Sequence, residues 1–205
     1  RRELQAKAVA AREVGGDEFA YWDKRQLVKK INLNSLYGAL LNPGSRFFDS
    51  RLGQSTTLTG RCIARHMAAE INRIIAGEYD HQGKAIVYGD TDSTYFSSYP
   101  MLKEQIDKNE INWDRDNIIA YYDAVCQEVS KTFPGFMSRT FHTTLDLGSI
   151  IEADKEMVGS AGIFITKKRY AMLVFDNEGK REDVDGNPGY IKAMGLDLKR
   201  SDTPP

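Results

Sequence analysis

The sequence predicts an α+β fold, in which helices pack on one face of a mostly antiparallel sheet and a helical hairpin comes first. Helical patterns occupy residues 1–14 and 23–41, on either side of a short glycine-rich break. A long amphipathic pattern over 56–76 then precedes two short β-branched segments that are joined by a tight turn. Strands joined by so few residues pair antiparallel, so the three observations together indicate the α+β class.

The two opening helices are predicted from the spacing of their apolar residues and from the breaks that follow them. Leu4, Ala8 and Ala11 recur at helical spacing in the first pattern, and Gly15-Gly16-Asp17 ends it. The second pattern stops at Asn42-Pro43-Gly44. Two helices around so short a break form an antiparallel hairpin, which lacks a core of its own.

The middle of the chain is predicted to be an extended piece, a long helix and a β-hairpin. Residues 47–53 are the extended piece. Ser55 or Thr56 is expected to cap the helix, and Gly77 is expected to end it. The two strands and the turn between them are placed at residues 84–88, 93–97 and 89–92.

The second half is predicted to contain one more long helix and the remaining strands. Asp114 or Asp116 caps the helix, which runs to about Thr132. The preceding residues, 101–116, are predicted to be a solvated insertion. Further strands are placed at residues 144–152, 162–176 and 190–198.

Composition excludes several classes of protein. The 205 residues are 41% hydrophobic and 28% charged, which rules out wholesale disorder. No apolar run approaches the ~18 residues of a membrane helix, and the first residues show neither a secretory signal nor an initiator Met. We therefore expect a piece of a longer cytosolic protein, with Cys62 and Cys126 as reduced core thiols.

The charge balance is nearly neutral, with 28 basic against 29 acidic residues and a net charge of −1. Taken alone, this balance argues against a nucleic-acid-binding protein. The two signs are nevertheless clustered apart, as expected for a protein that grips phosphates and also holds metals. The alternative is that each cluster is simply a solvated face.

The stretch Tyr88-Gly-Asp-Thr-Asp-Ser93 is the most informative one for chemistry. Asp90 and Asp92 share a hairpin tip, where at ~6 Å and an effective dielectric of ~20 their repulsion is about 3 kcal/mol. A hard divalent cation removes that repulsion and takes oxygen ligands. A plain Asx turn is the alternative. A calcium loop fails because Tyr95 and Met101 stand where that loop needs Gly and Glu.

The stretch Lys29-Lys-Ile-Asn-Leu-Asn-Ser-Leu-Tyr-Gly38 gathers polar groups on one helix face. Lys30, Asn34, Tyr37 and Gly38 share this face at helical spacing. A nucleoside triphosphate would find there a cation for its phosphates and an aromatic plane for its base. The alternative is a helix that uses Asn and Tyr to satisfy polar groups of a core.

Together, the two stretches resemble motifs of the family B DNA polymerases, and most closely those of T-even-like tailed phages. The first resembles the incoming-nucleotide motif of the fingers, and the second resembles the metal-binding motif of the palm. Three further elements continue the family's order, namely an acidic pair, the KKRY element and the start of the thumb. They are found at Asp154-Lys155-Glu156, Thr166–Tyr170 and Arg200–Pro204.

The resemblance implies template-directed DNA polymerisation in DNA replication, with nucleotidyl transfer from a dNTP to a primer 3′-hydroxyl by two Mg²⁺ ions, or by Mn²⁺ as an alternative. It implies that Asp92 is the metal ligand, that Asp90 supports the site or ligates a metal transiently, and that Glu156 is a further acid near the metals. Nucleotide contacts are implied for Lys30, Asn34, Tyr37 and Gly38. DNA contacts are implied for Lys167, Lys168, Arg169, Tyr170, Lys199 and Arg200.

The resemblance also implies a division into domains. Residues 1–46 correspond to the C-terminal part of the fingers, 47–190 to the palm and 191–205 to the start of the thumb. The family's first carboxylate motif, an Asp followed closely by SLYPS, is absent, as are the exonuclease and amino-terminal domains and most of the thumb. We therefore expect the isolated chain to be inactive until the remaining domains or a partner chain supply the first catalytic Asp.

The expected partners are primer-template DNA, dNTP and a sliding clamp, with no membrane, in the cytoplasm of an infected bacterial host. Two other functions stay open from the sequence. One is a non-catalytic module that binds primer-template DNA. The other is a split-gene subunit that is active only with its partner chain.

Overall fold

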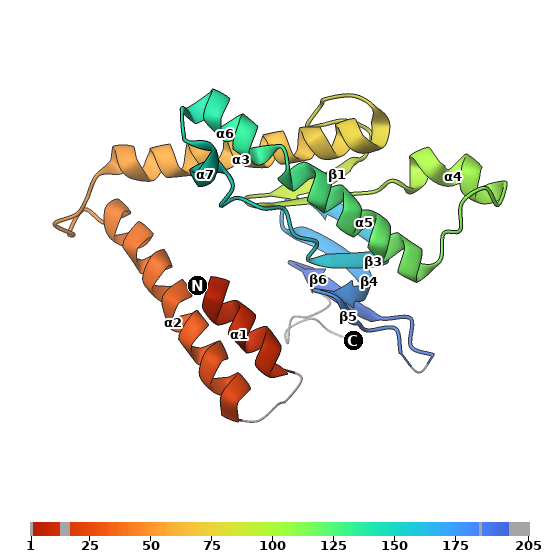
Figure 1. The fold of residues 1–205 in the computed structure, drawn as a ribbon, viewed down its shortest axis with the longest axis horizontal. Coiled ribbons are helices and arrows are strands. Elements are labelled where there is room, and N and C mark those ends of the chain that lie inside the picture. The colour runs from red at the N-terminus through yellow and green to blue at the C-terminus, as the bar shows by residue number, and fades with distance from the viewer. Residues whose placement is uncertain (1, 13–16, 185, 197–205) are drawn as a thin grey trace. The chain divides into compact units, whose positions relative to one another are not determined.

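The computed structural model describes residues 2–12, 17–184 and 186–196, and it confirms the predicted α+β class. Figure 1 shows long helices early in the chain and paired strands in its middle and second half. Within the described residues, no helix is both long enough and apolar enough to cross a membrane. The chain divides into two compact units, Arg1–Thr59 and Gly60–Pro205, which are described separately. The predicted domain limits at 46/47 and 190/191 stay a prediction.

The first unit begins with the predicted helical hairpin, made of α1 (Arg2–Arg12) and α2 (Asp17–Leu41). The two helices pack side by side (Figure 1), and Lys7 Nζ lies 4.7 Å from the centre of the Trp22 ring. No residue of α2 is buried, although much of the helix is apolar. The hairpin therefore has little core of its own, as the sequence predicted.

Helix α3 (Ser50–Ala76) begins before its predicted start. Asp49 is the reason, because its Oδ1 accepts a hydrogen bond from the Arg51 backbone N–H at 2.9 Å, the interaction of an N-terminal cap. The predictions of an extended piece at 47–53 and of a cap at Ser55 or Thr56 are therefore wrong. The predicted end is confirmed, since Gly77 follows the helix with φ +83°.

The core of the second unit forms where α3 meets α5 (Arg115–Ser130) and α6 (Phe133–Phe141). Its fully buried members are Ile71 on α3, Val125 and Val129 on α5, and Phe133 on α6. Ile86 of β1 (Ile86–Asp90) and Phe96 of β2 (Ser93–Phe96) pack against this cluster. The first β-hairpin is thus anchored to the helices at its base.

The strands form two separate antiparallel sheets among the described residues. One is the β1–β2 hairpin, and in the other β4 pairs with three strands. The larger sheet consists of β3 (Met157–Thr166), β4 (Arg169–Asn177), β5 (Lys180–Arg181) and β6 (Tyr190–Met194). The antiparallel pairing is as predicted.

The predicted solvated insertion at 101–116 has no buried residue, and its first part belongs to helix α4 (Tyr99–Asp107). Two further predictions for the second half are wrong. The supposed strand at 144–152 contains the short helix α7 (Leu145–Gly148), which Thr144 caps. The supposed single strand at 162–176 is two strands, β3 and β4, joined by a tight turn. Cys126 is buried, as predicted, and burial raises its pKa to about 11. Cys62, in contrast, is exposed.

Candidate functional site

The two aspartates lie at the tip of the β1–β2 hairpin, as the sequence predicted. Asp90 pairs with Ser93 across a loop of only Thr91 and Asp92. Asp92 is exposed and Asp90 is half-buried. Thr91 has φ +44°, a conformation that a β-branched residue adopts only under constraint. Its hydroxyl donates to Asp90 Oδ1 at 3.2 Å, which orients that carboxylate.

The chemistry of this tip fits a hard divalent cation. Mg²⁺ commonly takes one or two carboxylates and fills its other positions with water and substrate phosphates. Asp90 and Asp92 offer such a partial set of oxygens. Within the described part of the chain, no three His, Cys, Asp or Glu side chains form a metal-binding group, so Glu156 is not gathered with the two aspartates. Glu156 is exposed, and its Oε1 lies 3.7 Å from Lys192 Nζ.

The basic residues Lys167 and Lys168 form the second tight turn, between β3 and β4. Thr166 pairs with Arg169, so the loop consists of these two lysines alone. Lys168 has φ +61°, and its backbone N–H donates to the Tyr88 hydroxyl at 2.8 Å. The structure therefore joins the basic turn to the strand that carries Asp90. Sequence reasoning predicted the acidic tip and singled out these lysines, but it predicted neither the basic turn nor this connection.

Four aromatic side chains lie between the two hairpins. Tyr88 and Tyr95 are partners across β1–β2, and Phe164 and Tyr170 are partners across β3–β4. The ring centres of Tyr88 and Phe164 lie 5.6 Å apart, and those of Tyr95 and Tyr170 lie 5.3 Å apart. The Tyr95 and Tyr170 hydroxyls are 2.8 Å apart. Burial and this hydrogen bond raise the pKa of Tyr95, so its hydroxyl stays protonated.

This aromatic cluster was missed from the sequence, although a signal for it was present. In each hairpin an aromatic residue lies within a few positions of the loop on both strands, and directly paired rings stabilise a sheet. Tyr170 was predicted as a DNA contact. It is 7% exposed and its hydroxyl is bonded to Tyr95, so its contact with DNA stays a prediction.

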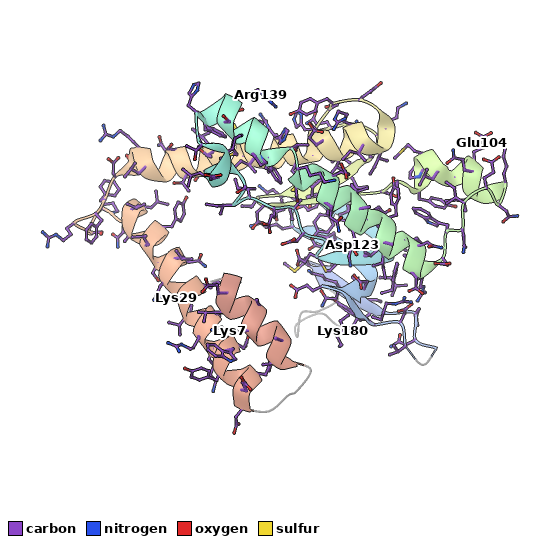
Figure 2. The ribbon with its side chains drawn as sticks, viewed as in Figure 1. Lys7, Lys29, Glu104, Asp123, Arg139 and Lys180 are labelled. Carbon is purple, nitrogen blue, oxygen red and sulfur yellow. The ribbon has the colours of Figure 1, made fainter. Side chains whose placement is uncertain are left out.

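A buried ion pair lies behind the predicted acidic element. Lys155 pairs with Asp176 of β4, and their side chains are 7% and 1% exposed. Lys155 Nζ also lies 3.8 Å from Asp123 on α5, the helix on which Figure 2 labels that residue. Lys155 is thus fixed inward, and its neighbours Asp154 and Glu156 are exposed.

A cavity of about 730 Å³ lies beside the first hairpin. It follows β2 from Ser93 to Phe96 and β3 from Met157 to Gly162, and it reaches Asp92, Asp154 and Glu156. Among the described residues β2 pairs only with β1, and β3 pairs only with β4. The cavity therefore lies along two strand edges whose backbone groups have no strand partner.

In the first unit, α2 carries the four predicted nucleotide contacts on exposed surface. Lys30, Asn34, Tyr37 and Gly38 are all exposed, and a side chain at Gly38 would meet no atom within 4 Å. The Tyr37 hydroxyl lies 2.9 Å from Thr57 Oγ1. Because α2 buries no residue, Asn34 and Tyr37 do not serve a core, which was the alternative interpretation. Figure 2 labels the neighbouring Lys29 on this helix.

The remaining predicted contacts are Lys199 and Arg200. Both lie outside the residues that the structure describes.

Comparison with known proteins identifies the family. A family model for DNA polymerase family B matches residues 1–109, which is more than half of the 205 residues. The chain therefore belongs to DNA polymerase family B. It is 29% identical to the DNA-directed DNA polymerase of Escherichia phage RB69 over 189 residues, covering 87% of this chain and 20% of that protein.

Two other relatives define the breadth of the similarity. The DNA-directed DNA polymerase of Enterobacteria phage T4 is 30% identical, covering 87% of this chain and 20% of that protein. The DNA polymerase alpha catalytic subunit of Arabidopsis thaliana is 28% identical, covering 89% of this chain and 10% of that protein. The predicted likeness to T-even-type phage polymerases is confirmed. The chain spans about a fifth of the length of the two phage relatives.

Proposed function

We propose that this chain is the nucleotide-binding and primer-binding part of a template-directed DNA polymerase. In this function a nucleotidyl group passes from a dNTP to the 3′-hydroxyl of a primer during DNA replication. The observation that carries the proposal is the β1–β2 tip, where Asp90 ends β1 and Asp92 lies in the strained two-residue loop that follows. Family membership supports it, and the exposed α2 face and the basic turn supply the contacts that such a reaction needs.

Asp92 is the proposed principal ligand of the catalytic Mg²⁺, and Asp90 is the supporting carboxylate. When bound, the metal neutralises charge that develops on the attacking and leaving oxygens. The protein's own contribution is to hold both carboxylates at a rigid tip. The Thr91 hydroxyl bonded to Asp90 keeps one of them oriented before substrate arrives. Glu156 is the proposed further acid near the site.

The α2 face is proposed to bind the incoming dNTP. Lys30 would meet the triphosphate as a cation, and Asn34 one turn later would orient it. Tyr37 offers a ring for the nascent base pair, and the open surface at Gly38 permits close approach. Phosphoryl transfer depends mostly on such positioning and charge neutralisation, so these contacts would act directly on the rate.

The basic turn is proposed to hold the primer duplex. Lys167 and Lys168 project from a two-residue loop, and Arg169 follows at the start of β4. Such cations bind phosphates without reading sequence, and their binding weakens as salt rises. Tyr170 lies in the aromatic cluster and is 7% exposed, so little of its surface is open to DNA.

A further carboxylate is proposed to come from a segment outside this chain, either the rest of a longer polymerase or a partner chain. The cavity between β2 and β3 supports this idea, because it offers two unpaired strand edges beside Asp92. An extended segment could pair with these edges and bring an acid to the tip.

Primer extension tests the proposed function. The assay uses a labelled primer-template, Mg²⁺ and all four dNTPs, with this chain alone and mixed with a fragment that carries the first carboxylate motif of the family. We expect extension only in the mixture. Asp92→Ala should lower the rate at least ~10³-fold, equivalent to about 4 kcal/mol of transition-state stabilisation. Asp107→Ala, which removes an exposed carboxylate from α4, is the matched control and should leave the rate unchanged.

Each other outcome has a definite meaning. Extension by the chain alone would show that its own acids complete the site, and it would overturn the proposed external carboxylate. Near-normal extension by Asp92→Ala would overturn the assignment of the metal ligand. Duplex binding without extension in either sample would favour a non-catalytic DNA-binding module.

A further inference from the structure

We propose that Tyr88 is a positioning residue whose hydroxyl holds the basic Lys167–Lys168 turn in register with the acidic Asp90–Asp92 tip. This inference rests on the proposed function, because it assigns the basic turn to the primer duplex. Its basis is the hydrogen bond that the Lys168 backbone N–H donates to the Tyr88 hydroxyl at 2.8 Å. The bond joins residues that are 80 positions apart in the chain.

The two tips are built alike, and both carry strain. Each is a two-residue loop in an antiparallel hairpin, and each contains a residue other than glycine with positive φ, namely Thr91 at +44° and Lys168 at +61°. Loops of this size favour Gly, Asn or Asp where φ is positive. A lysine persists in such a conformation only where its surroundings hold it there.

The surroundings of Lys168 supply that constraint from two sides. On one side its N–H is bonded to Tyr88. On the other side its carbonyl packs closely against Gly195, where a Cβ would lie 2.2 Å from the Lys168 oxygen. Arg169 Nε donates to the Gly195 carbonyl at 3.2 Å. The turn is thus fixed by contacts that lie outside its own hairpin.

The position of Tyr88 makes its hydroxyl the direct connection between the two tips. Tyr88 lies two residues before Asp90 on the same strand. Its ring is fixed by the cluster, with Tyr95 at 5.6 Å, Phe164 at 5.6 Å and Tyr170 at 5.9 Å between ring centres. A shift of the acidic hairpin would therefore move the amide that shapes the basic turn. The hydrogen bond between Tyr88 and Lys168 therefore sets the distance between the proposed metal carboxylates and the proposed primer-binding cations.

The test measures binding of this 205-residue chain to a fluorescein-labelled primer-template by anisotropy at several salt concentrations. The variants are Tyr88→Phe, Lys168→Ala and the double variant. Tyr88→Phe keeps the ring and removes the acceptor, so we expect affinity to fall about fivefold, which is about 1 kcal/mol at 1.4 kcal/mol per tenfold. We also expect faster amide hydrogen exchange at Lys168 and a double variant that is no weaker than Lys168→Ala.

Tyr122→Phe is the matched control. The Tyr122 hydroxyl also accepts from a backbone N–H, that of Ser98 at 3.4 Å, and the pair lies at the start of α4 and on α5. This change should lower stability but leave duplex affinity and Lys168 exchange as in the wild type. A purely structural role for Tyr88 would give the same result as Tyr122→Phe.

The failures of the two proposals are distinguishable. If Lys168→Ala weakens binding while Tyr88→Phe does not, the positioning role is overturned and the basic turn keeps its proposed contact with DNA. Additive effects in the double variant would also overturn the positioning role. If Lys168→Ala leaves binding unchanged, both proposals are overturned, because Tyr88 is proposed to act only through that turn.

Discussion

Asn72→Ala should destabilise the second unit by about 3 kcal/mol, because Asn72 holds the segment that leads into the acidic hairpin. Asn72 lies in the last part of α3 and is fully buried. Its Nδ2 donates to the Glu78 carbonyl at 2.8 Å, and its Oδ1 accepts from the Ala85 N–H at 3.0 Å. Ala85 is itself fully buried, and its carbonyl accepts from the Ser97 N–H, which follows β2 at the base of the hairpin.

The magnitude follows from what each backbone group would do after the substitution. The Ala85 N–H would be left without a partner in a dry site, at a cost of about 1–3 kcal/mol. The Glu78 carbonyl lies in an exposed segment and can return to water, so its lost bond costs about 1 kcal/mol. The sum is about 2–4 kcal/mol, and its midpoint of about 3 kcal/mol lowers Tm by roughly 6–12 °C for a chain of this size.

Urea unfolding gives the global free energy, and hydrogen exchange at the Ala85 amide gives the local one. Asn32→Ala, on the exposed surface of α2, is the control for the side-chain change alone and should alter stability by less than about 0.5 kcal/mol. A loss below about 1 kcal/mol for Asn72→Ala, with Ala85 exchange unchanged, would refute the reasoning. It would show that the hairpin is held by its core contacts and not by this amide.

Three further predictions concern other parts of the molecule. Burial lowers the pKa of His66 below its usual 6.5, so the unfolded state binds more protons and stability falls as pH drops below about 6.5, by at most ~1.4 kcal/mol per pH unit. Urea unfolding at several pH values should show a flatter dependence of stability on pH for His66→Gln, and equal profiles for the variant and the wild type would contradict this prediction. Lys155→Met leaves Asp176 charged and buried and should lower stability by about 3–5 kcal/mol, most of which should be recovered when Asp176→Leu is added. Thermal unfolding measures both variants, and a Tm that falls further in the double variant would contradict this prediction. A Cβ at Gly38 would meet no atom within 4 Å, so Gly38→Ala should raise helix stability by up to about 1 kcal/mol while weakening dNTP binding by the complete polymerase. Unchanged dNTP affinity would remove Gly38 from the proposed site.

The long elements could be predicted from the sequence because their signals are local. The apolar spacing of α3 and the Asp114 cap of α5 are patterns within one or two turns, and Asp114 accepts from Asn117 N–H as expected. The tight turn around Asp90 and Asp92 was also local, so the hairpin could be placed from its turn and its β-branched flanks.

The errors occurred where the local signal was ambiguous or absent. Proline breaks the interior of a helix but is favourable in its first turn, and Pro100 and Pro134 lie in the first turns of α4 and α6, two helices that the sequence analysis did not place. The β3–β4 turn was missed because Lys167 and Lys168 are not turn residues by propensity. The conformation of Lys168 depends on Tyr88 and Gly195, which are distant in sequence, so local reasoning could not have found it.

The candidate site was predictable as separate motifs but not as an assembly. Asp90, Asp92 and Lys168 could each be singled out from their local sequence as candidates for metal and phosphate chemistry. Their connection through the Tyr88 hydroxyl and the ring of Tyr170 depends on the packing of two hairpins, which no spacing in the sequence specifies.

The two-residue loop between Asp90 and Ser93 fixes the length of this tip as firmly as its chemistry fixes the two carboxylates. Successive residues of a strand face opposite sides, so one inserted residue would force either a bulge or a shift that turns the following side chains over. Tyr95 would then leave the aromatic cluster, and Asp92 would project to the other side. A change in the length of this tip therefore requires the neighbouring hairpin to change with it, because the Tyr88 and Tyr95 rings pack against the rings of that hairpin.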